Sequence, residues 1–385
     1  AHITHLNNDH NMPVCVRAGG SLFRDLSNVQ IPGVDAIWNQ IWPETVNDFP
    51  KFASSVSHAY GKPRAFSESF AAYYTSPSIP QAKYVVDYQI VRGINFFEFM
   101  FWMAGSARDN WMTDPGMKGL NDYTNRTTYL MAQGVPGARI AVYYPTSTLW
   151  LGDNAVNPDL VSISQILLQH QKDFDWVDDD AFTEALSVTG DGFRNLSGQT
   201  YSTLIIPSCD VISTSAWDKM MEFAAAGGKI LFWGRKPTML AGRSFMEPSP
   251  VPDTPDLLQE PSVSWTPTVA AAMPAPEMEI ILPPKPETPR RGPRTGAEEQ
   301  KPDPASFIRY TARTLTDGSL FFLFNEGEQE CSFKAAFDRS GSVRTWDASS
   351  GEVSALSATA EDGKTVLEMT LAPWESRIIS IGDQR

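Results

Sequence analysis

The chain has 385 residues, of which 42% are hydrophobic, and this length predicts two or three domains. Its 45 Asp and Glu residues outnumber its 31 Lys and Arg residues, and the net charge of −14 disfavours binding to the phosphate backbone of a nucleic acid. No apolar run reaches the ~18 residues needed to cross a bilayer. We therefore expect neither nucleic acid nor a membrane among its partners.

The first region of the chain alternates short apolar runs with helical patterns. The apolar runs predict strands at 13–17, 34–38, 63–67 and 94–102, and the helical patterns cover 49–59 and 79–91. Strands that alternate with helices are typical of βαβ units and a parallel sheet. The run at 94–102 is apolar without alternation, which predicts a strand covered on both faces.

A second α/β region follows the sequence GVPG at 134–137. Buried strands are predicted at 138–145, 174–178, 201–207 and 227–234, with helices at 158–171, 179–186 and 214–226. This order predicts a doubly wound domain with a parallel sheet. The region lacks GxGxxG and GxxxxGK motifs, which argues against nucleotide binding.

The last part of the chain changes character twice. Residues 247–304 are rich in proline, which removes backbone donors and fixes φ, so we expect a linker or an extended wrap without regular helix or central strand. Residues 305–385 carry short strand patterns at regular intervals, separated by turn pairs such as Asp317-Gly318 and Asp362-Gly363. That spacing predicts a small antiparallel β-sandwich.

The cysteines point to packing and not to chemistry. Cys15, Cys209 and Cys331 are far apart and show no CxxC spacing, so neither a disulfide framework nor a zinc site is indicated. Cys209 follows a strand of the second region, but no glycines flank it as the strained elbow of a nucleophile requires. We expect all three to be small core residues and the second region to be catalytically silent.

Glu68 is the main candidate for a catalytic group. It comes at the carboxyl end of the predicted strand 63–67, and in parallel βα architectures ligand sites lie at that end. The neighbouring strands end in further carboxylates, amides and indoles: Asp35, Asn39, Gln40, Trp42 and Glu44 after one, and Glu98, Trp102, Asp109 and Trp111 within or after the other. Carboxylates and amides bind sugar hydroxyls, and an aromatic plane supports the apolar face of a pyranose. The set predicts a sugar site.

Each of these residues also has a structural interpretation. Glu68 could be solvated near a helix start with Ser67 as the N-cap, and Asp35 and Glu44 could be capping residues as well. The aromatic run from Phe96 to Trp102 is typical of a core. Glu98 within that run is harder to explain, because burying an unpaired charge is costly. His58 lies on the apolar stripe of a predicted helix and is interpreted as structural.

Four stretches of the chain resemble a known family. The stretches are PGVDAIWNQIW at 32–42, KFASSVSHAYGKPRAFSESFAAYY at 51–74, VRGINFFEFMFWMAG at 91–105 and VPGARIAVYYPTSTLW at 135–150. They resemble glycoside hydrolase family 106, the α-L-rhamnosidases. The resemblance continues through YSTLIIPSCD and AAAGGKILFWG into the terminal β region, and so covers nearly the whole chain.

The resemblance implies an architecture and a set of roles. Residues 1–134 would be the carboxyl-terminal half of a (β/α)8-type barrel, 135–246 a flavodoxin-like domain, 247–304 a linker and 305–385 a β-sandwich. Glu68 would be the general base of an inverting hydrolase of terminal α-L-rhamnosides, with Asp35, Asn39, Gln40, Trp42, Glu98 and Trp102 binding the substrate. Calcium would lie near the site without assignable ligands. Rhamnose-containing glycans as substrates favour a periplasmic or extracellular location.

The chain also departs from the family pattern. A full (β/α)8 barrel takes about 250 residues, whereas the first region supplies 134. We therefore expect a fragment of a larger hydrolase that lacks the strands carrying the general acid and that is inactive alone. Two alternatives stay open: a retaining hydrolase of β-galactosidase type with Glu68 as nucleophile, and a non-catalytic carbohydrate-binding or scaffold protein.

Overall fold

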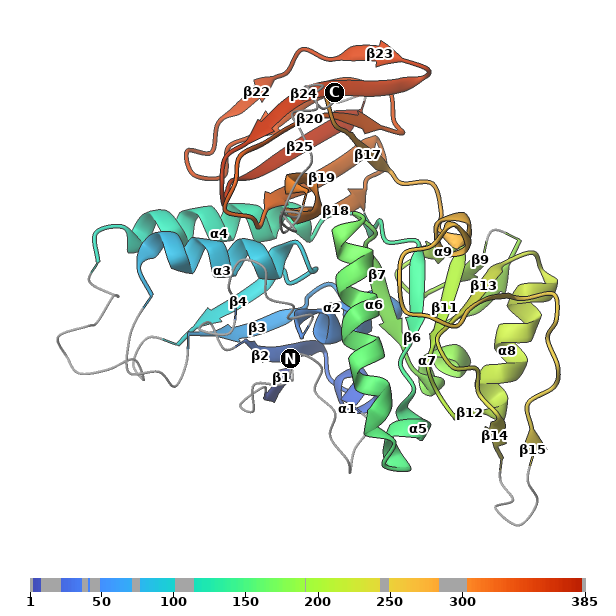
Figure 1. Ribbon diagram of the computed structural model, residues 1–385. Coiled ribbons are helices and arrows are strands. Elements are labelled where there is room, and N and C mark those ends of the chain that lie inside the picture. Colours follow the sequence, from blue (N-terminus) through green and yellow to red (C-terminus); the bar gives the residue numbers. More distant parts are fainter. Residues whose placement is uncertain are drawn as a thin grey trace, which may run out of the picture.

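The computed structural model shows a mixed α/β protein with several sheets (Figure 1). It describes residues 3–7, 22–36, 41, 49–70, 77–100, 114–190, 192–242, 249–283 and 303–382. None of the helices in these ranges is long and apolar enough to cross a membrane. The sheets form three groups, which we call the N-terminal sheet, the central sheet and the C-terminal sheets.

The N-terminal sheet has four parallel strands that lie side by side in chain order. They are β1 (Ile3–Asn7), β2 (Ile31–Ala36), β3 (Phe66–Ser69) and β4 (Phe96–Phe99). The intervening helices are α1 (Leu22–Ser27), α2 (Pro50–Ala59) and α3 (Ile79–Ile90). This order confirms the predicted parallel βα arrangement. Within the described residues the strands form an open sheet with β1 and β4 at its edges, and the predicted strand at 13–17 lies outside those residues.

Local sequence explains where α3 begins. The Ser78 hydroxyl accepts a hydrogen bond from the Gln81 amide, and the Gln81 side chain accepts one from the Ser78 amide, which together form a capping box. Pro80 follows in the first turn, where its missing N–H costs nothing. A further helix, α4 (Met117–Met131), packs beside α3 through Leu120 and Tyr123; the sequence patterns did not predict it.

The central sheet has five parallel strands, β6 (Ile140–Tyr143), β7 (Phe174–Val177), β11 (Thr203–Pro207), β13 (Lys229–Trp233) and β16 (Leu258–Glu260). From one edge their order is β7, β6, β11, β13 and β16, so the chain begins inside the sheet and moves outward in both directions. The helices around it are α5 (Thr146–Trp150), α6 (Asn157–Gln169), α7 (Asp179–Glu184) and α8 (Thr214–Ala225). Ile140 and Val142 share a core with α6, whereas Ala141 and Tyr143 share one with α8. Helices on both faces explain why β6, β7 and β11 are buried throughout.

Two small antiparallel or mixed sheets lie at the rim of the central sheet. One comprises β8 (Ser187–Thr189), β9 (Gly192–Arg194) and β10 (Thr200–Tyr201). The other comprises β12 (Val211–Ser213), β14 (Met239–Ala241) and β15 (Ser249–Pro250). Their strands are too short to carry a core of their own.

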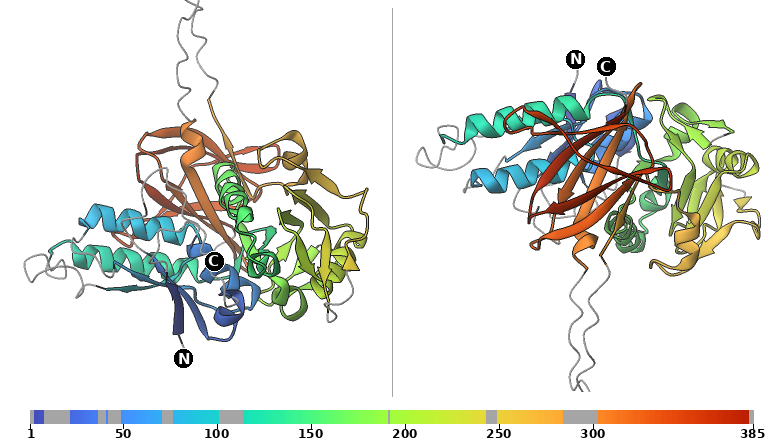
Figure 2. Two further views of the ribbon diagram at one scale, coloured as in Figure 1. Left: turned by 60° about the horizontal axis from the view of Figure 1, so that its bottom comes forward. Right: turned by 90° about the horizontal axis from the view of Figure 1, so that it is seen from above.

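Two C-terminal sheets pack face to face and lie above α3 and α4 in Figure 1, so that their strands are in front in the view from above in Figure 2. One contains β17 (Met278–Ile281), β20 (Cys331–Phe337), β24 (Lys364–Leu371) and β23 (Thr359–Glu361). The other contains β22 (Val353–Ala355), β21 (Ser342–Trp346), β25 (Ser376–Gly382), β19 (Gly318–Asn325), β18 (Ile308–Thr314) and β5 (Val135–Pro136). On β19, Phe321 and Leu323 enter the core between the sheets, while Phe322 and Phe324 contact the α3 and α4 layer. Because successive side chains of β19 point to opposite faces of the sheet, this strand contributes to two hydrophobic cores.

The proline-rich segment departs from the expectation of a linker without regular structure. Its described part provides β16 to the central sheet, a helix α9 (Pro267–Ala272), and β17 to a C-terminal sheet. Proline is tolerated because Pro267 occupies the first turn of α9, after the N-cap Thr266, and because β16 and β17 are edge strands. Val135–Pro136 likewise pairs with β18, so the chain touches a C-terminal sheet before it enters the central one.

Helix α2 is buried along its whole length between the N-terminal and central sheets. Such a helix is normally apolar all round, yet α2 carries Lys51, Ser55 and His58. These side chains converge on Asp175 of β7: the Asp175 carboxylate lies 3.5 Å from the Lys51 ammonium, 3.4 Å from the Ser55 hydroxyl and 3.0 Å from His58 Nδ1. Lys51 also contacts Asp173 at 2.8 Å.

The carboxylate of Asp175 accepts two further hydrogen bonds from the rim. The Gln199 amide donates at 2.9 Å and the Tyr201 hydroxyl at 3.0 Å. We call this group, Asp175 with Lys51, Ser55, His58, Gln199 and Tyr201, the Asp175 network. Burial alone would raise the pKa of Asp175, but His58, Lys51 and the donated hydrogen bonds outweigh burial and hold that pKa well below its usual range. The network therefore fixes α2 against the central sheet with a charged carboxylate.

We expect Asp175→Asn to destabilise the fold by ~3–5 kcal/mol at pH 7, because it removes one of the two carboxylates that face the buried Lys51 ammonium and replaces a charged acceptor of the Gln199 and Tyr201 hydrogen bonds with a neutral amide. The pKa of Asp175 is lower in the folded protein than in the unfolded chain, where an Asp has a pKa of about 4. The stabilisation by its charged form is therefore complete above that unfolded pKa and is lost as the pH falls toward the folded pKa. The deficit of the variant should thus shrink at pH 3. Urea unfolding followed by tryptophan fluorescence at pH 7 and pH 3 measures both effects.

The matched control is Asp122→Asn, which removes a carboxylate paired with Lys118 on the surface of α4. That variant should unfold at nearly the wild-type urea concentration, because exposed ion pairs contribute little. A deficit of the Asp175 variant that is absent at pH 7, or that is the same at both pH values, would contradict the role given to the network.

Candidate functional site

Three carboxylates lie in one row across the N-terminal sheet. Asp35 of β2 is in register with Glu68 of β3, and Glu68 is in register with Glu98 of β4. Residues in register on parallel neighbours share a face. Each strand ends one residue later, so this acidic row lies at the carboxyl ends of the strands, where sequence analysis placed the site.

The opposite face of β3 shows why Glu68 points away from the helices. Ser67 and Ser69 are buried, their hydroxyl oxygens are 3.0 Å apart, and the Gln89 amide of α3 donates to the Ser69 hydroxyl at 3.0 Å. Glu68 lies between these two serines and therefore projects from the other face. The interpretation of Ser67 as a helix N-cap is wrong, because Ser67 lies within β3 and the next described helix begins at Ile79.

The acidic face carries an aromatic floor as well. Phe66 and Phe96 are in register two residues before Glu68 and Glu98, and their ring centroids are 5.7 Å apart. Phe66 is only 4% exposed, whereas Phe96 is 39% exposed. This pair was not among the predicted site residues, although β3 and β4 both read Phe-x-Glu.

The exposure of β4 corrects two expectations. The apolar run at 94–102 predicted a strand covered on both faces, but Phe96 and Glu98 are exposed, while Phe97 and Phe99 are partly covered. Among the described residues the helices cover one face only. The charge of Glu98 is therefore not buried and needs no internal counter-charge.

The other predicted site residues cannot be placed in the row. Asn39, Gln40, Trp42, Glu44, Trp102, Asp109 and Trp111 lie outside the described residues. The structure thus brings together Asp35, Glu68 and Glu98 of the predicted set. No group of three His, Cys, Asp or Glu side chains in the described ranges is arranged to hold a metal ion. The calcium implied by resemblance has no fitting ligand set there.

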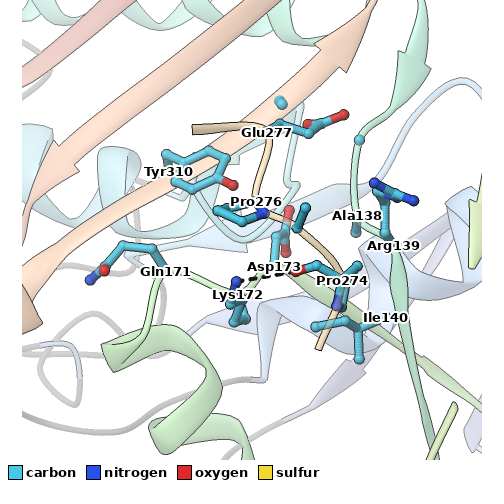
Figure 3. Close-up of a pocket in the computed structure, with 13 residues that line it drawn as sticks. Ala138, Arg139, Ile140, Gln171, Lys172, Asp173, Pro274, Pro276, Glu277 and Tyr310 are labelled. Carbon is cyan, nitrogen blue, oxygen red and sulfur yellow. Dashed lines mark hydrogen bonds between the residues drawn. The ribbon is translucent and has the colours of Figure 1, made fainter. Parts of the chain in front are cut away.

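A cavity at the junction of the central and C-terminal sheets has a different character (Figure 3). Its volume is about 30 Å³, which is room for a water molecule and too little for a sugar. Lys172 donates a hydrogen bond across it to the Pro274 carbonyl at 3.3 Å. Burial, with a smaller contribution from Asp173, raises the pKa of Glu277 to about 7. The size excludes this cavity as a substrate site.

In parallel sheets such as the central sheet, ligands usually bind at the carboxyl ends of the strands. Here the polar groups at those ends form hydrogen bonds and ion pairs with one another. The Thr148 hydroxyl accepts from the amides of Asp210 and Val211 at 3.1 and 3.0 Å. Arg235 bridges Asp153 at 2.6 Å and Asp210 at 2.9 Å.

Cys209 follows the carboxyl end of β11. It is fully buried, and burial raises the pKa of its thiol. A protonated, inaccessible thiol is no nucleophile. Cys331 is buried as well, as expected of a core residue, and Cys15 lies outside the described residues.

Comparisons with known proteins agree with a glycoside hydrolase. Residues 27–247 match the model of the family Glyco_hydro_106, described as alpha-L-rhamnosidase. Among curated protein sequences none matches the chain significantly.

Several solved structures share the fold at low sequence identity. A rhamnosidase from Novosphingobium sp. PP1Y superposes with a TM-score of 0.66 at 18% identity, covering 94% of this chain and 36% of that one. An exo-carrageenase of family GH42 from Bacteroides ovatus gives 0.57 at 11% identity, covering 94% and 49%. A GH42 β-galactosidase from G. stearothermophilus gives 0.56 at 11% identity, covering 99% and 64%. The chain thus spans about a third to two thirds of the length of these proteins.

The exposure of Phe96 leads to a test of the uncovered face. We expect Phe96→Ser to lower the fluorescence of a bound hydrophobic dye and to reduce self-association of the chain, with little loss of stability. Phe66→Ser, the matched change at the buried neighbour, should instead cost ~3 kcal/mol in urea unfolding. If both variants lost equal stability, Phe96 would be a core residue and the face would be covered.

Proposed function

This chain belongs to the α-L-rhamnosidase family Glyco_hydro_106, and we propose that its acidic row is part of the catalytic centre of a glycoside hydrolase acting on terminal α-L-rhamnosides. The observation that carries the proposal is the alignment of Asp35, Glu68 and Glu98 at the carboxyl ends of parallel strands. The exposed Phe96 ring beside the row, which packs on the buried Phe66 ring, supplies an apolar surface for the sugar.

In this proposal Glu68 is the general base of an inverting reaction. Its carboxylate takes a proton from a water molecule, the water oxygen forms a bond to the anomeric carbon, and a second carboxyl group protonates the leaving oxygen. The middle position in the row supports the choice of Glu68, because the exposed Glu98 on one side of it can bind a sugar hydroxyl, while the buried Asp35 lies on the other side. We expect Asn39, Gln40, Trp42 and Trp102 to complete the substrate site.

The strand spacing bears on the identity of the acid. Neighbouring strands lie ~4.8 Å apart, whereas the two carboxyl groups of an inverting glycosidase are ~6.5–9.5 Å apart. Asp35 and Glu98 are each one strand from Glu68, so their backbones lie closer to it than the separation of an inverting pair, which disfavours either of them as the acid. The acid therefore belongs to a part of the enzyme outside the described strands.

The open sheet supports a larger catalytic domain. Parallel sheets are normally covered on both faces, and an open sheet has two unpaired edges. We infer that β1–β4 are the later strands of a (β/α)8 barrel within residues 1–134, and that the isolated chain is inactive.

The other two sheet groups support the remaining domain assignments. The central sheet, with its outward order from β6, supports a flavodoxin-like domain at 135–246. The two facing C-terminal sheets support a β-sandwich at 305–385. Within 247–304, the described strands and helix attach to both neighbours.

A retaining mechanism is the second candidate. Retaining glycosidases place their carboxyl groups ~5–5.5 Å apart, which is close to the spacing of adjacent strands. Glu68 would then be the nucleophile, with Asp35 or Glu98 as acid and base. This assignment corresponds to a hydrolase of β-galactosidase type, and a covalent glycosyl adduct on Glu68 would distinguish it from the inverting one.

We expect Glu68→Gln to lower turnover of an aryl α-L-rhamnoside by ~10²–10⁴-fold, because the amide accepts no proton from water. The measurement uses the full-length natural polypeptide that contains this sequence, with proton NMR of the first-formed sugar to report the anomeric outcome. Glu98→Gln, on the exposed end of the row, is the matched control and should raise KM more than it lowers kcat. Unchanged turnover in the Glu68 variant would remove that residue from the mechanism.

A further inference from the structure

A second hollow lies between α4 and the turn that follows β21. Its volume is about 350 Å³, within the usual size range of small-ligand sites. Helix α4 provides one wall, and Trp346 with the turn at 347–352 provides the other. We call it the Trp346 hollow, and it is lined by Asn125, Arg126, Tyr129, Leu130, Trp346, Asp347, Ala348, Gly351 and Glu352.

Hydrogen bonds join the two walls of the Trp346 hollow. The Arg126 guanidinium donates to the carbonyls of Ala348 at 2.9 Å and Ser349 at 2.8 Å, which ties the turn to α4. Gly351 has a φ of 86°, and a Cβ there would come within 3.3 Å of Arg126. Glycine thus lets the turn approach the guanidinium closely.

The turn itself is also ordered from within. The Asp347 carboxylate accepts from the Ser349 amide at 2.8 Å and from the Ser350 hydroxyl at 2.7 Å. The hydrogen bond from Ser350, with Arg126 as a weaker influence, lowers the pKa of Asp347. The Trp346 indole N–H donates to the Ser380 hydroxyl at 2.9 Å, which fixes the ring. The hollow is therefore preformed.

The inner surface combines an aromatic floor with unused polar groups. Trp346 is partly buried, and Tyr129 on the opposite wall is 63% exposed. The Tyr129 hydroxyl, the Asn125 amide and the Glu352 carboxylate have no hydrogen-bond partner among the described residues. A few polar groups around an apolar surface fit a ligand that has one apolar face and several hydroxyls.

We propose that the Trp346 hollow is a non-catalytic binding site for a neutral pyranose unit of the glycan substrate. The sugar ring stacks on Trp346 and Tyr129, and its hydroxyls bond to Asn125 and Glu352. The choice of a rhamnose-containing glycan rests on the proposed function, whereas binding of a sugar rests on the hollow alone. The methyl group of a 6-deoxy sugar adds to the apolar contact with Leu130.

The position of the hollow separates it from the catalytic row. Helices α3 and α4 pack together on one face of the N-terminal sheet, and the acidic row is on the face turned away from α3 (Figure 1). A neighbouring hollow of about 300 Å³ shares Trp346, Asp347 and Ala348 with the Trp346 hollow and is also lined by Lys83. Adjacent units of one glycan chain fit this pair of hollows. The site would hold a polymeric substrate near the enzyme while another chain end is hydrolysed.

Binding without turnover tests the proposal. The probe is a soluble rhamnogalacturonan, used in affinity electrophoresis, with methyl α-L-rhamnoside titrated against tryptophan fluorescence. We expect Tyr129→Ala and Glu352→Ala each to weaken binding by about threefold to tenfold. Both side chains are exposed, so neither change should unfold the protein, which circular dichroism verifies. Trp150→Ala, an exposed aromatic residue on α5, is the matched control and should bind as wild type.

The outcomes separate this site from the acidic row. Glu68→Gln should keep the binding that Tyr129→Ala loses. If Glu68→Gln abolished all binding while Tyr129→Ala and Trp346→Phe left it unchanged, the glycan would bind only at the row and the Trp346 hollow would be excluded. Loss of binding in Tyr129→Ala together with full turnover in Glu68→Gln would support the hollow and contradict the proposed base. Failure of the folded wild type to bind either probe would overturn the inference.

Discussion

The buried carboxylate of Asp175 is the constraint on which the arrangement of the chain depends. A charge in the interior must be compensated, and its compensating groups come from α2 and from the rim of the central sheet. Asp173, on the same strand end, adds the Thr311 hydroxyl of β18 at 2.9 Å. One polar cluster therefore joins elements of all three sheet groups. Since α2 also packs on β2, the cluster fixes where the N-terminal sheet lies.

The C-terminal sheets brace the same layer of helices from the other end. Glu326, just after β19, pairs with Arg92 at the end of α3 at 2.5 Å and with Arg309 of β18 at 3.1 Å. The Asp87 carboxylate of α3 accepts hydrogen bonds from Tyr123 and Ser376. Both contacts are on the helix side of the N-terminal sheet. The acidic row is thus supported from behind, and on its own face Glu98 of β4 is exposed while Asp35 of β2 is buried.

The strand ends of the central sheet and of the N-terminal sheet differ in how they are covered. The central sheet has the parallel architecture that often binds ligands, but its strand ends are occupied by Thr148 and Arg235 and its buried thiol is protonated. The central sheet positions the N-terminal sheet through its contacts with α2. In the N-terminal sheet, by contrast, the Glu98 carboxylate at the end of β4 is exposed.

The sequence by itself determined the parallel βα order, helices such as α2 and α3, and the choice of Glu68 with Asp35 and Glu98, because hydrophobic period and strand ends are local properties. It did not reveal α4, nor that the proline-rich segment supplies β16 and β17, since those elements are stabilised by neighbours far along the chain. Only the tertiary structure decided that three carboxylates share one register, and that their common face is exposed at Glu98 and buried at Asp35. Register depends on hydrogen bonds between strands about thirty residues apart, and exposure depends on which face the helices cover.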